Sequence, residues 1–459
     1  MVSRREFLLS SGIAAFATPL KAFQSRLAAA RSVTGAGYGP IAPVTDITTG
    51  LKLLELPAGF TYLSFGWAGD PMANGAPTPS KHDGMAAFRA KDGLVALVRN
   101  HEVAAAQPGQ KTPAFGSTPY DPEAGGGTTT TLFNPKTRSV VSTVPSLSGT
   151  LVNCAGGPTP WGSWLSCEET LLDPKRAPTT TRPHGYIYEV PHDRVSDARP
   201  LVAMGRFWHE AVAVDPETGI VYETEDRSAS GLYRFIPNKR DVLSEGGRLQ
   251  ALAIAGKPLF DTRIGQADRG RAAHPEYDIE WVDIPAPDTA HVDETAWDTR
   301  GVFQQGLDGG AATFARLEGA WFGNGRLFFT ATSGGDAKMG QVWELNPRRG
   351  RLRLVFESPG PEVLAMPDNI TLSRRGGLAI CEDGPAIQRV QGLTTNGQLI
   401  VFARNNVVLS GEKHGLSGDF RRMEFAGVTY SPDGEWMFVN IQTPGITFAI
   451  TGPWGRGML

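Results

Sequence analysis

The sequence has few cysteines, no excess of positive charge and no apolar stretch long enough to cross a membrane. Lysine and arginine number 44 against 47 aspartate and glutamate residues, so the net charge is −3. A chain without a basic surface is not expected to bind nucleic acid or an anionic membrane. The apolar stretch at residues 8–20 is shorter than the roughly 20 residues of a spanning helix. We therefore expect neither a nucleic-acid partner nor stable membrane insertion.

Several common catalytic motifs are also missing. The sequence has no CxxC or HExxH zinc spacing, no GxSxG nucleophile motif, and no regular ligand spacing among its eight histidines. The glycine-rich stretch at residues 333–340 lacks the Gly-Lys-Ser/Thr ending of a phosphate-binding loop. These absences disfavour a histidine-rich zinc site, a serine hydrolase and a nucleotide-binding loop.

The first residues resemble an export signal. Ser3-Arg4-Arg5-Glu6-Phe7-Leu8 precedes the apolar stretch, and three alanines follow at residues 28–30. This layout predicts a twin-arginine signal peptide at residues 1–30, with the export machinery as a partner and the periplasm or the outside of the cell as the destination. An amphipathic N-terminal helix is the alternative. The mature chain, residues 31–459, is expected to be a single domain.

Six segments repeat one pattern of an alternating apolar run, a turn and a second apolar run. With 55 glycines and 34 prolines, the chain has many turns, and the pattern is typical of β-hairpins. Recurring hairpins without long helices predict an all-β fold, a six-bladed β-propeller, with a β-sandwich as the competing architecture. Insertions are expected between blades at residues 104–127 and 254–316. The segments begin at Gly84, Cys154, Glu210, Glu318, Pro367 and Phe425.

Acidic residues and one cysteine recur where the first strand of each segment begins. In a propeller these positions converge on the central channel, and crowded carboxylates there must take up protons or bind cations. The residues are Asp83, Cys154, Glu210, Glu318, Asp368 and Glu424. The ends of the second strands add Glu102, Glu168, Glu169, Glu225, Asp226, Glu382 and Asp383. Separate solvated turns are the alternative explanation for each residue.

The donor types indicate which ions such a site would take. Carboxylate oxygens suit Ca²⁺ and Fe³⁺, whereas a thiolate favours a transition metal. The chain has only three cysteines, Cys154, Cys167 and Cys381, so at least one thiol has no disulfide partner within the chain. Burial or metal ligation would protect that thiol in an oxidising compartment.

Arg316 is the candidate for holding a substrate anion. It lies two residues before Glu318, and this spacing on a strand places both side chains on one face. A guanidinium matches two phosphate oxygens and stays charged at any working pH. A structural ion pair with Glu318 is the alternative. Arg227, which follows Asp226, is a second candidate.

These residues resemble those of the PhoX family of alkaline phosphatases. The resemblance is carried by NCAGGPTPWGSWLSCEE from Asn153, and by NHE, HEA, RLEGAW, PDN and SPDGEWMFVNIQ elsewhere in the chain. It implies a six-bladed propeller that holds iron (Fe³⁺) and calcium (Ca²⁺) ions. By position it implies Arg316 as the catalytic phosphate binder and, as metal ligands, Cys154, Glu168, Glu210, Glu318, Asp368, Glu382 and Glu424.

The chain departs from the family pattern at two positions. Thr131 stands where an asparagine that helps to hold phosphate is expected, and Thr443 stands where a histidine is common. The leading hypothesis is therefore an exported, monomeric phosphomonoesterase that acts on small phosphate esters, with Arg316, Thr131 and Arg227 as substrate-binding residues. A calcium-dependent lactonase-like hydrolase and a catalytically silent metal-containing propeller are the alternatives.

Overall fold

The structure is a computed structural model that describes residues 38–104, 110–175, 177, 179–263, 275–290, 301–394 and 397–459. The predicted signal peptide at residues 1–30 lies outside them. Strands dominate these residues, so the prediction of an all-β class is confirmed. No helix in the described ranges is both long enough and apolar enough to span a membrane. The helical elements there are short: α2 (Val302–Asp308), η1 (Lys91–Gly93), η2 (Val202–Met204), η3 (Leu243–Glu245) and η4 (Trp454–Arg456).

Three sheets contain the strands from the first half of the chain and those paired with them. A four-stranded sheet has the order β4 (His82–Arg89), β5 (Val95–His101), β6 (Gly126–Asn134) and β7 (Ser139–Thr150). A three-stranded sheet follows with β8 (Asn153–Pro158), β9 (Ser163–Glu168) and β10 (Ile187–Pro191). A nine-stranded sheet has the order β11 (His209–Val214), β12 (Val221–Glu225), β13 (Leu232–Pro237), β14 (Gly247–Ile254), β15 (Glu276–Asp283), β19 (Arg351–Glu357), β18 (Gln341–Asn346), β17 (Arg326–Ala331) and β16 (Leu317–Gly323).

The remaining sheets combine the two ends of the described chain. A six-stranded sheet has the order β20 (Pro367–Leu372), β21 (Leu378–Glu382), β22 (Arg389–Leu393), β23 (Leu399–Asn405), β2 (Leu54–Pro57) and β1 (Ile41–Val44). A four-stranded sheet has the order β26 (Phe425–Tyr430), β27 (Met437–Ile441), β28 (Ile446–Thr451) and β3 (Thr61–Phe65). A small ribbon pairs β24 (Val408–Ser410) with β25 (Ser417–Asp419). Because β3 pairs with β28, an early strand completes the last sheet.

All six predicted hairpins are confirmed as antiparallel pairs: β4–β5, β8–β9, β11–β12, β16–β17, β20–β21 and β26–β27. Their turns use the expected chemistry. Between β16 and β17 the two-residue loop is Asn324-Gly325, and both residues have left-handed φ values, 53° and 69°. Two left-handed residues in a row are what a tight hairpin turn requires, and Asn-Gly supplies them at low steric cost.

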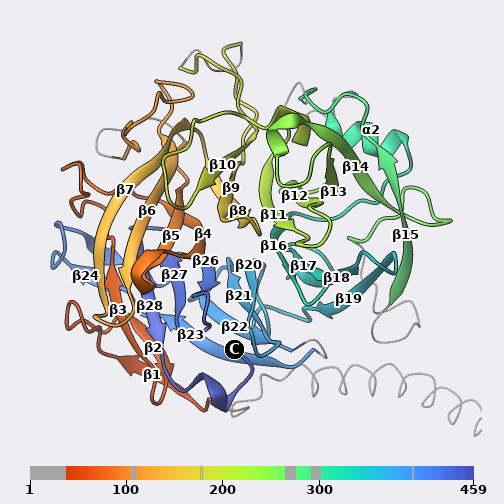
Figure 1. Cartoon of the computed structure of the whole chain (residues 1–459). Helices are drawn as coiled ribbons and strands as arrows, with labels where there is room; N and C mark the ends of the chain where they lie inside the picture. Colours follow the sequence, from red (N-terminus) through yellow and green to blue (C-terminus); the bar gives the residue numbers. More distant parts are fainter. Residues whose placement is uncertain are drawn as a thin grey trace, which may run out of the picture.

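The first strands of the six hairpins form a closed inner ring. Each contacts the next in the order β4, β8, β11, β16, β20, β26, and β26 contacts β4 again. Figure 1 shows these strands nearest the centre, with the sheets extending outward in a propeller-like arrangement. The strands approach so closely that a Cβ on Gly84 would lie 2.6 Å from the Cα of Ala155, which explains a glycine there. The hydrogen-bonded sheets are unequal, because the nine-stranded sheet includes two of the six hairpins.

The two predicted insertions differ in their place in the fold. The prediction that residues 104–127 separate two blades is wrong, because this segment connects β5 to β6 and these strands pair with each other. Residues 254–316 do lie between two sets of strands, and they contribute β15 and α2. Strand β15 pairs with β14 on one side and with β19 on the other, and so joins two four-strand sets into one sheet.

The apolar core lies between the faces of neighbouring sheets. Ala86 and Phe88 of β4, for example, pack in one buried cluster with Trp164 of β9 and Tyr188 of β10. Burying a large apolar side chain contributes about 1.5–3 kcal/mol. This packing holds each inner strand against the neighbouring sheet and so helps to position the ends of the inner strands.

Candidate metal centre

The six hairpins present three equivalent positions at one end of the inner ring. The entry position is the residue just before the first strand, and the exit position is the residue just after the second strand. In every hairpin the exit residue's N–H donates to the entry residue's carbonyl, at 2.8–3.2 Å. The exit and entry pairs are Glu102 and Lys81, Glu169 and Val152, Asp226 and Trp208, Thr332 and Arg316, Asp383 and Met366, and Gln442 and Glu424.

The third position, which we call the bulge position, is the second residue of each inner strand. In five of the six hairpins the register shifts between the first and fourth residues of this strand, so that it contains one extra residue. A bulge of this kind redirects a side chain out of the regular alternation. In β26 the shift comes one residue later. The residues at the bulge position are Asp83, Cys154, Glu210, Glu318, Asp368 and Ala426.

Side chains from these positions form three groups with the geometry of cation sites. In each group, one ligand atom from each residue lies within 4.8 Å of the others. The thiol group is Cys154, Glu169 and Glu210; the first acidic group is Asp83, Glu102 and Glu424; the second acidic group is Glu210, Glu318 and Asp368. Glu210 belongs to two groups, so its two oxygens could serve neighbouring ions. Its Oε1 accepts a hydrogen bond from the Cys154 thiol at 3.3 Å.

Burial and mutual repulsion disfavour the charged forms of these carboxyls. Burial is the larger cause and neighbouring carboxylates the second, and together they raise the pKa of Asp368 to about 8. The pKa of Glu102 rises to about 6, again through burial, although the nearby Lys81 opposes the rise. The pKa lies well above its ordinary value in Asp83, Glu169, Glu210, Glu318 and Glu424. A multivalent cation would relieve this repulsion, so the donor set fits a metal.

An orphaned atom supports the same conclusion. Oε2 of Glu210 is buried and has no hydrogen-bond partner among the described residues. An unpaired buried carboxylate oxygen costs a substantial free energy, so such atoms in native proteins usually meet a ligand, an ion or water. The Cys154 side chain is a neutral thiol when no ion is bound. Burial, and then the charges of Asp83 and Glu210, raise its pKa well above the usual value. A bound cation would favour its thiolate form.

Arg316 lies at the entry position directly beside the second acidic group. Its Nε and Nη2 donate to both oxygens of Asp226, and its Nη2 also donates to Glu318 at 2.7 Å. Burial alone would lower the pKa of Arg316, but Glu318 and Asp226 outweigh it and raise the pKa. The ion pair with Glu318, which was the alternative to phosphate binding, is therefore present. Among the described residues Nη1 makes no hydrogen bond, and the side chain is 31% exposed, so one face of the guanidinium remains open to an anion.

Two predicted ligands, Glu168 and Glu382, do not belong to any of the three groups. Glu168 is enclosed within its sheet, where it accepts hydrogen bonds from His184 Nδ1 at 2.6 Å and from the Gly185 N–H at 2.8 Å. Glu382 pairs in the same way with Arg389, at 2.6 Å. Each residue is the last of its strand and directly precedes an exit residue. Because successive side chains on a strand point to opposite faces, the neighbour of an exit residue faces away from the ring.

The two other predicted substrate-binding residues make contacts outside the three groups. Thr131 is in β6, the third strand of its sheet, and its hydroxyl is hydrogen-bonded to Thr143 of β7 at 3.0 Å. Arg227 follows an exit residue, and its guanidinium stacks on the ring of Trp208, 4.4 Å from the centroid. Five predicted ligands are brought together: Cys154, Glu210, Glu318, Asp368 and Glu424.

The residues that sequence reasoning missed are Asp83, Glu102 and Glu169, each of which completes one of the groups. All three are acidic residues at strand ends in the sequence, but the family resemblance implies Glu168 as the ligand and not its neighbour Glu169. The sequence signal for such ligands is a pair of adjacent acidic residues at the end of a second strand, as in Glu168-Glu169 and Glu382-Asp383. Only one member of such a pair can face the ring, and the register of the hairpin decides which.

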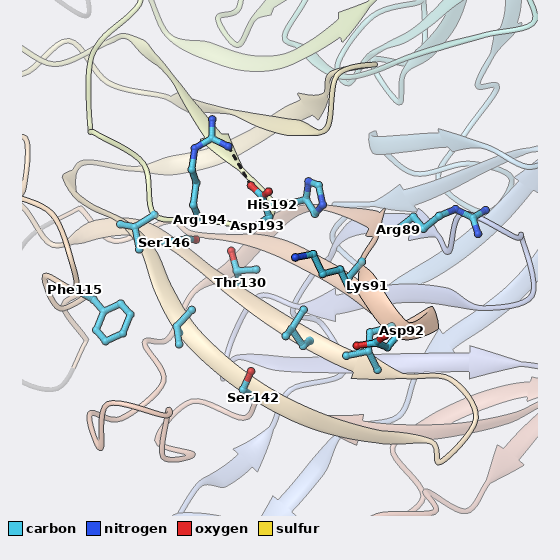
Figure 2. Close-up of a pocket in the computed structure, with 15 residues that line it drawn as sticks. Arg89, Lys91, Asp92, Phe115, Thr130, Ser142, Ser146, His192, Asp193 and Arg194 are labelled. Atoms are coloured by element: carbon cyan, nitrogen blue, oxygen red, sulfur yellow. Dashed lines mark hydrogen bonds and ion pairs between the residues drawn. The ribbon is translucent and has the colours of Figure 1, made fainter.

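A separate cavity lies in a different part of the molecule. It has a volume of about 800 Å³ and lies over β6 and β7, the outer strands of their sheet. Figure 2 shows Thr130 and Ser142 on these strands, Lys91 in the turn beside them, and the ion pair of Asp193 with Arg194 on another wall. None of its lining residues occupies an entry, bulge or exit position. The candidate metal centre is therefore defined by the inner ring and not by this cavity.

Comparison with known proteins places the ring in context. The model of the family described as alkaline phosphatase PhoX matches residues 36–445, whereas no curated protein matches the sequence. A solved structure of PhoX from Pseudomonas fluorescens, in complex with the transition state analogue vanadate, has a TM-score of 0.65 and 16% identity, covering 91% of this chain and 99% of that one. A gluconolactonase from Xanthomonas campestris has a TM-score of 0.44 and 13% identity, covering 92% and 100%. The likeness to the Pseudomonas structure shows a shared fold.

Proposed function

This chain belongs to the alkaline phosphatase PhoX family, and from that premise we propose which of its residues carry the hydrolysis of phosphate monoesters. Membership makes the protein a metal-dependent phosphoric monoester hydrolase. The observation that supports an assignment of residues is the convergence of entry, bulge and exit positions into three groups of cation ligands at one end of the ring.

The thiol group would hold an iron ion and the first acidic group a calcium ion. A thiolate with two carboxylates suits Fe³⁺, whereas three carboxylates from Asp83, Glu102 and Glu424 provide only the hard oxygens that Ca²⁺ prefers. The second acidic group shares Glu210 with the thiol group, which suits a second ion next to the first. Bound cations in these groups supply positive charge that stabilises the oxygens of a phosphoryl group as it is transferred.

The protein's own residues would orient the substrate and limit access of water. Asp226 and Glu318 hold Arg316 through Nε and Nη2, so Nη1 is left without a hydrogen bond among the described residues, and this donor would bind a phosphoryl oxygen. Asp226 acts as the positioning partner, because its two oxygens fix the plane of the guanidinium. Fixed donors of this kind stabilise developing charge without reorganising during the reaction. The deep burial of Glu210 and Glu318 keeps the anionic side of the site dry.

We revise the roles predicted for Thr131 and Arg227. The Thr131 hydroxyl is bonded within its own sheet and the Arg227 guanidinium stacks on Trp208, so we assign substrate binding chiefly to Arg316. Arg227 would act through its neighbour, since its carbonyl accepts the backbone N–H of Arg316 at 2.7 Å. This contact helps to hold Arg316 in its left-handed backbone conformation, with φ of 48°.

We further propose a six-bladed propeller within a single domain at residues 31–459. The closed ring of six inner strands and the six repeated entry and exit hydrogen bonds support this count. In this reading the nine-stranded sheet comprises two blades bridged by β15. Export by the twin-arginine machinery to the periplasm or medium, and a monomeric state, complete the proposal.

The decisive experiment is an assay of the native protein with elemental analysis. Purified holoprotein should hydrolyse an aryl phosphate at alkaline pH, contain both iron and calcium, and lose activity when a chelator removes them. Activity should return when both ions are restored. Metal-replete protein without turnover would refute the proposed function, and calcium without iron would refute the assignment of the thiol group.

A further inference from the structure

Lys81 occupies the entry position of its hairpin and is the structural counterpart of Arg316. Each of these cations lies two residues before a bulge-position carboxylate, Asp83 in one case and Glu318 in the other. Both have a left-handed backbone, with φ of 54° at Lys81 and 48° at Arg316. The carbonyl of each accepts the exit residue's N–H, at 2.9 and 2.8 Å. The repeat therefore brings two cations, from two different sheets, to the same end of the ring.

The surroundings of Lys81 place its ammonium beside the first acidic group. Its Nζ donates to Oε1 of Gln442 at 2.9 Å, and Nε2 of the same Gln442 donates to Glu102. Lys81 is half-buried, and its charge acts on Glu102 and Glu424, two members of the group. Gln442 thus fixes the ammonium close to these carboxylates without a direct ion pair among the described residues.

The ammonium also keeps donors available for a ligand. A lysine has three N–H donors, and within the described ranges Lys81 uses one of them, for Gln442. The left-handed backbone of Lys81 belongs to the entry position and not to the cation, since the entry residues Val152 and Met366 share it, with φ of 48° and 53°. What Lys81 shares with Arg316 alone is a cation with open donors, because Nη1 of Arg316 makes no hydrogen bond among the described residues.

We propose that Lys81 is a second substrate-binding cation, which contacts phosphoryl oxygens at the edge of the first acidic group while Arg316 contacts the phosphoryl group beside the second. The inference rests on the proposed phosphatase function. The ligand is a phosphate monoester dianion, whose three terminal oxygens can accept hydrogen bonds from both cations. Lysine provides a compact point charge, whereas arginine provides a planar pair of donors. Two cations of different shape would hold the dianion in one orientation.

The test compares metal-replete holoprotein of the wild type with Lys81→Gln, Lys81→Arg and the control Lys52→Gln, which changes an exposed lysine. The measurements are kcat and KM for para-nitrophenyl phosphate, the inhibition constant of inorganic phosphate, and metal content per chain. Losing one charge-assisted hydrogen bond should raise KM and the inhibition constant of Lys81→Gln by about 10- to 100-fold. Lys81→Arg should remain within about 3-fold of the wild type by keeping the charge. Metal content should be unchanged in all four proteins, because Lys81 is not a ligand.

Two results would overturn the inference. One is an unchanged inhibition constant in Lys81→Gln that has full metal content. The other is a change that appears only together with metal loss, since Lys81 would then serve the carboxylates and not the substrate. If the wild type fails to hydrolyse the ester, the proposed phosphatase function is refuted, and this result is independent of the role of Lys81. Calorimetric binding of inorganic phosphate to wild-type and Lys81→Gln holoprotein then still decides the role of Lys81.

Discussion

Two adjacent glutamates provide a stringent test of the ring geometry. Glu168 faces the interior of its sheet, whereas Glu169 is an exit residue and belongs to the thiol group. The variants Glu168→Gln and Glu169→Gln make the same chemical change at neighbouring positions. We expect the first to impair stability and the second to impair metal binding, because alternate side chains on a strand point to opposite faces.

The expected loss of stability in Glu168→Gln follows from its buried contacts. The carboxylate accepts hydrogen bonds from His184 and from the N–H groups of Leu151, Gly185 and Tyr186. Breaking a buried charged pair costs about 3–5 kcal/mol. With an unfolding entropy of about 2.1 cal/mol/K per residue, 459 residues give roughly 1 kcal/mol/K. The melting temperature should therefore fall by about 3–5 °C, with little change in metal content.

Glu169→Gln should behave differently with and without metal. Burial, and then Asp226 and Glu102, raise the pKa of Glu169 well above its ordinary value. In metal-free protein the folded state therefore holds a proton that the unfolded state loses above about pH 4.5, so stability falls as pH rises from there through the folded pKa. Glutamine carries no charge, so metal-free Glu169→Gln should be more stable than metal-free wild type at pH 8 and similar at pH 4. With metal, the loss of a ligand should weaken affinity by more than the 10- to 100-fold typical of outer partners.

The assay combines calorimetric melting at pH 4 and pH 8, with and without chelator, elemental analysis, and hydrolysis of an aryl phosphate. Full metal content and activity in Glu169→Gln would refute the assignment of exit residues to the metal groups. Loss of metal from a folded Glu168→Gln protein would refute the argument from strand alternation, because that side chain would then serve the ring.

Three further outcomes are expected. Cys154→Ser should lose iron and its visible absorption together with hydrolysis, measured by elemental analysis and spectroscopy; a variant with full activity would instead favour a calcium-only hydrolase. Arg316→Gln should lower kcat/KM for an aryl phosphate by about 10- to 100-fold, the loss of one charge-assisted hydrogen bond, and an unchanged value would limit Arg316 to an ion pair. Burial alone would raise the pKa of Asp70, but hydrogen bonds from Lys413 and His414 outweigh it and lower the pKa. Its stabilisation is therefore present above about pH 4 and lost as pH falls through the lowered pKa, so Asp70→Asn should melt lower than wild type at pH 7, and the difference should shrink as the pH falls below about 4.

Much of the architecture was predictable because hairpins are local. Alternating apolar residues and turns such as Asn324-Gly325 act over a few residues, so all six central hairpins could be located from the chain. The acidic residues and Cys154 at the strand starts were visible in the same way. The segment at 104–127 was misplaced, because its length does not reveal that β5 and β6 pair across it.

The choice between neighbouring acids could not be made from the chain alone. Glu168-Glu169 and Glu382-Asp383 each contain two carboxylates one residue apart, and a shift of one residue exchanges the faces of a strand. The register of each hairpin, including the extra residue at its bulge, decides which carboxylate meets the ring. Composition carries no information about that register.

The sequence by itself determined the all-β class, the repeated hairpins and the membership of a phosphatase family, because these depend on local patterns and on short motifs. Only the tertiary structure decided which charged side chains lie close together. Asp83 and Glu424 are separated by more than 300 residues in the chain, yet both belong to the first acidic group. Closure of the ring brings β26 against β4. This long-range packing brings the carboxylates close enough to repel one another strongly. Bound cations would relieve that repulsion.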